Sequence, residues 1–153
     1  MLTALSAEDG RKLWECESGT AFHAPVDVFV INGVVWHKLG HQMDPMRVPP
    51  DKREARDLHT GELKVRDHVA QCLVTPGHHY RCYRAKATDR FLIVGKRGVE
   101  LMDLGGSGHS RNNWVRGSCQ YGVLPANGLL YAPPNSCGCY TEAMLRGFWA
   151  LAS

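Results

Sequence analysis

Several common features are missing from this 153-residue sequence, and each absence excludes a class of protein. No run of about 18 apolar residues occurs, so we expect no membrane-spanning helix. The first ten residues, MLTALSAEDG, contain neither a basic segment nor an apolar segment, so we expect no signal peptide in this chain. These absences leave the cellular location open.

A sustained basic stripe is also missing, although the formal net charge is +3. The 18 basic residues are scattered, and the one local cluster, within residues 47–57, is interrupted by acidic residues. A nucleic-acid-binding surface needs a continuous basic patch. We therefore expect no nucleic-acid partner. With 44% hydrophobic and 22% charged residues, the composition is that of a folded globular chain.

Cysteines are too few for a disulfide scaffold at this length, because there are only six. They are also too many to be dismissed as six unrelated core residues. Cys119 is expected on a connection between strands that adjoins the one carrying Cys137 and Cys139, so a disulfide or a shared soft-metal site with Cys137 or Cys139 is expected. Cys16 and Cys72 lie among strand residues and are most simply small buried apolar groups.

Helical periodicity of useful length is absent, whereas an internal repeat is present. An apolar strand followed by a polar, usually Gly-containing turn occurs four times. Aligned on Leu5, Leu58, Leu104 and Leu151, the repeats are spaced by 53, 46 and 47 residues. Between them lie pairs of apolar runs that predict hairpins. Asn32-Gly33 and Asn127-Gly128, each between two apolar runs, are the strongest of these signals.

Each period therefore holds about four short antiparallel strands, which is the content of one propeller blade. The segments LTALSAEDGRKLWE and VFVINGVVW closely resemble the repeat of pyrroloquinoline-quinone-type (PQQ-like) β-propellers. The resemblance covers nearly the whole chain, with periods longer than usual. We expect an all-β fold, a single partial β-propeller domain over residues 1–153. It would have about three four-stranded blades, at roughly 6–58, 59–104 and 105–151.

The chain opens and ends at the same strand position within a blade, near Leu2–Leu5 and Phe148–Leu151. An open arc of three blades leaves unpaired strand edges at both ends. Closed propellers have four to eight blades. We therefore predict closure by homodimerisation into a six-bladed ring, with each junction blade built from both copies. The alternative is a domain of a larger complex.

Histidines and cysteines collect on the connections that open on one face of such a propeller. Imidazole and thiolate ligands suit zinc and similar divalent ions. The expected metal ligands are His37, His41, His78 and His79, with His23, Cys137 and Cys139 as further candidates. The alternative for each histidine is an ordinary hydrogen-bonding or solvated loop residue.

Residues 78–81, His-His-Tyr-Arg, form the densest group of reactive side chains. The expected catalytic residues are His78, His79, Tyr80 and Arg81. A divalent metal ion, by preference zinc, would activate water there, while Arg81 would hold an anionic group and Tyr80 would donate a proton. This predicts a metal-dependent hydrolase of a small ester or phosphoester.

Two other functions stay open. One is a non-catalytic propeller module for binding or assembly, in which the histidines are incidental. The other is the function that the resemblance implies, part of a quinone-dependent dehydrogenase. The sequence lacks the vicinal-cysteine motif and the acidic calcium ligand set that this second function requires.

Overall fold

The computed structural model describes residues 1–18, 27–37, 52–68, 83–95, 98–106, 108–136, 138 and 145–152. Within these ranges the regular structure consists of thirteen strands and no helix, so the prediction of an all-β fold is confirmed. Consequently, no helix in the described part of the chain is long and apolar enough to cross a membrane.

The strands form four separate antiparallel sheets, numbered here in chain order. Sheet I contains β1 (Leu2–Leu5) and β2 (Lys12–Cys16). Sheet II contains β3 (Phe29–Ile31), β4 (Val34–His37), β5 (Lys52–Asp57) and β6 (Leu63–His68). Sheet III contains β7 (Lys86–Ala87), β8 (Phe91–Val94), β9 (Val99–Asp103) and β10 (Ser110–Asn112). Sheet IV contains β11 (Leu124–Ala126), β12 (Leu129–Ala132) and β13 (Trp149–Leu151).

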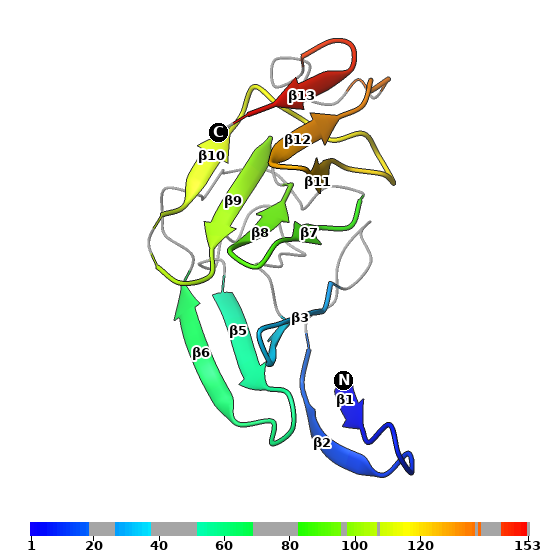
Figure 1. Ribbon diagram of the computed structural model, residues 1–153, viewed down its shortest axis with the longest axis vertical. Coiled ribbons are helices and arrows are strands. Elements are labelled where there is room, and N and C mark those ends of the chain that lie inside the picture. Colours follow the sequence, from blue (N-terminus) through cyan, green and yellow to red (C-terminus); the bar gives the residue numbers. More distant parts are fainter. Residues whose placement is uncertain are drawn as a thin grey trace.

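The sheets follow one another along the long axis of the molecule, from sheet I at one end to sheet IV at the other (Figure 1). Two apolar clusters join sheet III to its two neighbours. Trp36 and Ala55 of sheet II pack with Leu92 of sheet III. Ile93, on the opposite face of β8, packs with the residues around sheet IV. Because successive side chains of a strand point to opposite faces, β8 supplies both clusters. None of the sheets closes on itself into a barrel.

Two of the predicted hairpins are confirmed at Asn-Gly turns. Asn32 (φ 51°) and Gly33 (φ 75°) connect β3 to β4, and Asn127 (φ 51°) and Gly128 (φ 73°) connect β11 to β12. Positive φ at both central residues is the mark of a type I′ turn, whose twist matches that of the flanking strands. These dipeptides therefore fix the start of sheets II and IV.

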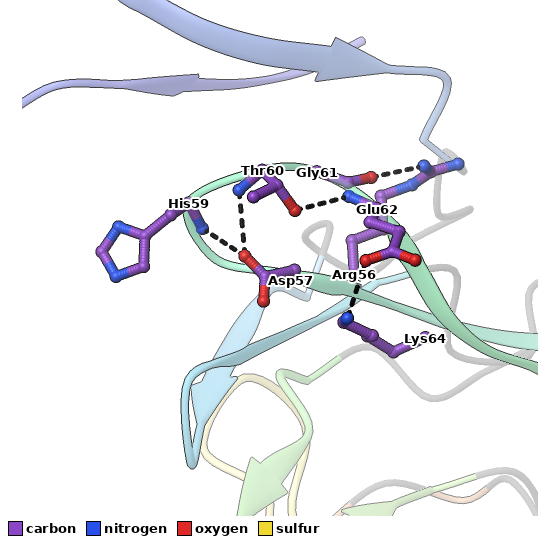
Figure 2. Close-up of polar contacts among 7 residues, drawn as sticks. All are labelled: Arg56, Asp57, His59, Thr60, Gly61, Glu62 and Lys64. Atoms are coloured by element: carbon purple, nitrogen blue, oxygen red, sulfur yellow. Dashed lines mark hydrogen bonds and ion pairs between the residues drawn. The ribbon is translucent and has the colours of Figure 1, made fainter.

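The repeated turn is visible in the hydrogen bonds between β5 and β6 (Figure 2). The Asp57 carboxylate accepts bonds from the amides of His59 and Thr60, at 3.0 and 2.9 Å. These bonds, that of Thr60 first, hold the pKa of Asp57 below its usual value. The amide of Gly61 donates to the Asp57 carbonyl at 3.1 Å. The turn is therefore closed by both the backbone and the side chain of its first residue.

The turn between β1 and β2 has the same backbone pattern. The Gly10 amide donates to the Ser6 carbonyl at 3.0 Å, and both Gly10 and Gly61 have φ 73°. Ser6 is thus equivalent to Asp57, which makes the first repeat 51 residues long. The alignment of Leu5 with Leu58 is two residues out, because it matched the leucines and not the turns.

Sheet I is attached to sheet II by Trp14. The indole Nε1 of Trp14 donates to the Leu58 carbonyl at 2.9 Å, and its ring lies directly on Gly61. A Cβ atom at Gly61 would lie 2.5 Å from Cγ of Trp14, so only glycine fits beneath the ring. Trp14 and Trp36 therefore pack between sheets. Trp114 and Trp149 are partly exposed, at 52% and 39%.

Candidate functional site

A histidine with no solvent-exposed surface lies between sheets I and II. His37 is the last residue of β4 and its exposed fraction is 0%. Its neighbour Trp36 points toward sheet III, so the alternation of the strand directs His37 toward sheet I. The sequence placed His37 on a connection between strands. The structure places it inside β4, where it pairs with Glu54 of β5.

Three further side chains surround this position. The Cys16 thiol at the end of β2 lies 3.9 Å from Nε2 of His37. Glu54, opposite His37 in the strand register, has 4% of its surface exposed. Oε1 of Glu54 accepts a bond from Nε of Arg66 on β6 at 3.2 Å. Thiol, imidazole, carboxylate and guanidinium thus follow one another across the interface, from sheet I to the outer strand of sheet II.

This group was not predicted, because Cys16 was interpreted as a buried apolar residue. The contact between Cys16 and His37 arises from the packing of two sheets, which no local sequence signal reveals. Chemically, a sulfur and a nitrogen donor at this distance are the ligand types that zinc prefers. Cys16 and His37 supply two donors, whereas a zinc site needs at least three from the protein. In the described ranges no group of three His, Cys, Asp or Glu residues is placed to hold a metal ion.

Most of the predicted site lies outside the described residues. This applies to the expected catalytic residues His78, His79, Tyr80 and Arg81, and to the expected metal ligands His23, His41, Cys137 and Cys139. Of the predicted site residues the structure describes only His37. Cys119 lies half-buried between β10 and β11, and its pairing with Cys137 or Cys139 stays a prediction.

Two further histidines, His59 and His109, lie in or beside turns between strands. His59 is exposed in the β5–β6 turn. His109 lies between β9 and β10, and its Nδ1 accepts a bond from the Asp103 amide at 3.0 Å. His109 therefore has a structural role in closing that turn.

Asp27 is a second polar residue that the sequence analysis missed. It precedes β3 and accepts a bond from the Ala85 amide at 3.0 Å, which connects sheet II to the start of sheet III. Burial raises the pKa of Asp27, and this effect outweighs the opposing effects of the Ala85 amide and of the Arg84 and Lys86 charges. The carboxylate therefore carries its charge at a cost in the folded chain.

Replacing Asp27 separates its hydrogen bond from its charge. Asp27→Ala removes the acceptor of a part-buried amide and should lower the free energy of unfolding by about 1–3 kcal/mol. Asp27→Asn keeps an acceptor and cannot ionise. Because folding raises the pKa of Asp27, the contribution of Asp27 to stability is most favourable below its unfolded pKa of 3.8. This contribution is lost as the pH rises through the folded pKa. Relative to Asp27→Asn, its stability should therefore fall across that interval, as urea unfolding from pH 3 to 7 would measure. A parallel pH dependence for the two proteins would contradict the raised pKa.

Comparison with known proteins adds no family to this description, since no protein-family model and no curated protein matches the sequence.

Proposed function

We propose that this chain is an arc of a β-propeller whose role is assembly, with the arc completed by a second copy. The four sheets follow one another in chain order (Figure 1), apolar clusters join sheet III to both of its neighbours, and sheets II and III each have four antiparallel strands. Equivalent turns recur at equivalent strand ends. These features support sheets II and III as two complete blades, with sheets I and IV as two incomplete ones.

The single observation that carries the proposed assembly is a pair of uncovered apolar surfaces, one on sheet II and the other on sheet IV. On sheet II, Phe29 and Ile31 of β3 pack toward sheet III, so Val30 between them points toward the side of sheet I. Sheet I has two strands and leaves Val30 with 57% of its surface exposed. Val28, at 41%, extends this surface.

Sheet IV covers sheet III with one face and leaves its second face open. Leu130 and Leu151 pack toward sheet III. Leu124, Tyr121 and Phe148 are exposed by 57%, 75% and 64%. Together with Tyr131, whose ring centroid is 6.0 Å from that of Phe148, they border a hollow of about 640 Å³. Clustered exposed apolar side chains of this kind mark an interaction surface.

The two surfaces are complementary. Among the described residues, no strand of sheet I covers Val30 of β3, and sheet IV supplies strands with an apolar outer face. When two copies are placed against each other, sheet IV of one copy would cover Val28 and Val30 of the other. Sheet I of that other copy would then lie beside β13 of the first. The symmetric arrangement buries both surfaces twice, which favours a second copy as the partner.

A metal-dependent hydrolase of small esters or phosphoesters is the second candidate. It is favoured by the contact of Cys16 with His37, which offers two of the donors that a zinc site would need. In this proposal the remaining ligands come from the predicted histidines outside the described residues. A metal ion bound there would activate water for attack on the ester.

One experiment tests both candidates. Light scattering on a size-exclusion column, followed by elemental analysis of the peak, gives mass and bound metal together. We expect about twice the chain mass of 17.0 kDa. About one zinc per chain, with hydrolysis of a nitrophenyl ester or phosphoester that a chelator abolishes, would support the hydrolase. A metal-free dimer without this activity would exclude it. A folded monomer would contradict the assembly.

A further inference from the structure

Three residues occupy the same place in successive sheets. Each lies on the outermost strand of its sheet. Its cross-strand partner is the residue two positions before the start of the repeated turn. The turns are matched by their hydrogen bonds, since the Leu58 amide donates to Gly33 as the Leu104 amide donates to Arg90. The three equivalent residues are Trp14 in sheet I, Val65 in sheet II and Ser110 in sheet III.

The first two of these residues fill the space between their sheet and the next. Trp14 places its indole ring on Gly61 and bonds to the Leu58 carbonyl. Val65 packs against the apolar cluster between sheets II and III, as does Leu104 of the next turn. At this position a side chain is therefore directed into the junction between two sheets.

Ser110 is too small to fill the third junction. A pocket of about 600 Å³ lies there, between sheets III and IV. Phe91, Ile93 and Leu101 line it from sheet III, and Leu130 and Leu151 line it from sheet IV. Trp114 borders it with half of its surface exposed. The space that an indole occupies in the first junction is a cavity in the third.

We infer that this pocket binds an uncharged, flat aromatic small molecule of about the size of indole, at the position equivalent to the Trp14 ring. Its volume is in the range of small-molecule sites, and its walls are mainly apolar and aromatic. No residue that lines it is charged, which disfavours an ionic ligand. The few polar groups on its wall include Ser110 and Asn112, whose side chains are hydrogen-bonded to each other at 3.3 Å.

The inference is tested with indole itself as the probe, by calorimetric titration and ligand-observed NMR on the full chain. We expect saturable binding of one indole per chain, with a dissociation constant on the order of 1 mM or lower. Ser110→Trp places the ring in the pocket covalently. It should weaken indole binding at least tenfold and raise the thermal midpoint by about 2–5 °C.

Arg111→Trp is the matched control, because the neighbouring side chain is exposed and points to the other face of β10. It should bind indole as the wild type does. If Ser110→Trp fails to fold, Ser110→Leu fills part of the same space and should weaken binding in the same direction. No saturable binding by the folded wild type, or equal binding by the folded Ser110 variants, would overturn the inference. The mass in solution is a separate readout, so this result and that of the assembly are independent.

Discussion

Leu124→Glu should convert the assembled protein into a monomer, with the mass falling from about twice 17.0 kDa to 17.0 kDa. Leu124 is 57% exposed on the open face of sheet IV, so the substitution costs little in the isolated chain. In the proposed assembly the same position is covered by another copy. An unpaired carboxylate buried there would cost several kcal/mol, which is enough to dissociate a dimer at micromolar concentration.

Val30→Glu tests the second surface in the same way, since it introduces the same charge on β3 of sheet II. It should also give a monomer. His59→Glu is the control: it adds the charge to an exposed turn that belongs to neither surface and should leave the mass unchanged. Circular dichroism must show that each variant is folded. Wild-type mass for both folded surface variants would refute the assembly through these faces.

Gly61→Ala should be among the most destabilising substitutions in the chain, and Gly10→Ala provides its matched control. Both glycines have φ 73° in equivalent turns. At Gly10 a Cβ atom meets nothing within 4 Å, so Ala introduces only the backbone strain of about 1–2 kcal/mol. At Gly61 a Cβ would overlap the Trp14 ring, which adds about 1–3 kcal/mol and displaces sheet I.

Urea or thermal unfolding of the two variants measures the difference. A double-mutant cycle assigns it: in a Trp14→Ala background Gly61→Ala should cost no more than Gly10→Ala, because the overlapping ring is gone. Equal costs for the two glycine substitutions in the wild-type chain would show that the contact of Trp14 with Gly61 contributes nothing to stability.

The hairpins of sheets II and IV could be read from the sequence because each rests on a local signal. Asn-Gly sets the turn, and alternation within Phe29–Ile31 or Leu129–Ala132 sets the faces. Strand β5 could not be read in this way. Its sequence, KREARD, has one apolar residue, Ala55, and the strand forms because it is paired on both sides. Here tertiary pairing overrides local propensity.

The candidate site was predictable only in its residue types. The contact of Cys16 with His37 joins two sheets through packing and has no local signature in the sequence. Asp27 was missed for a related reason. Its raised pKa and its bond to the Ala85 amide depend on a segment 58 positions away in the chain. Long-range juxtaposition of this kind follows from the stacking order of the sheets.

The alternation along β8 has a consequence for how such a chain can change in length. Leu92 and Val94 belong to the cluster with sheet II, while Ile93 belongs to the cluster with the residues around sheet IV. The two faces of this one strand thus belong to two different apolar clusters. If one whole sheet were inserted or deleted, each neighbouring sheet would pack against another sheet of the same kind, and local packing would be preserved. In the assembly proposed above, such an event would change the angle that the arc of sheets spans, and with it the number of copies needed to complete a ring.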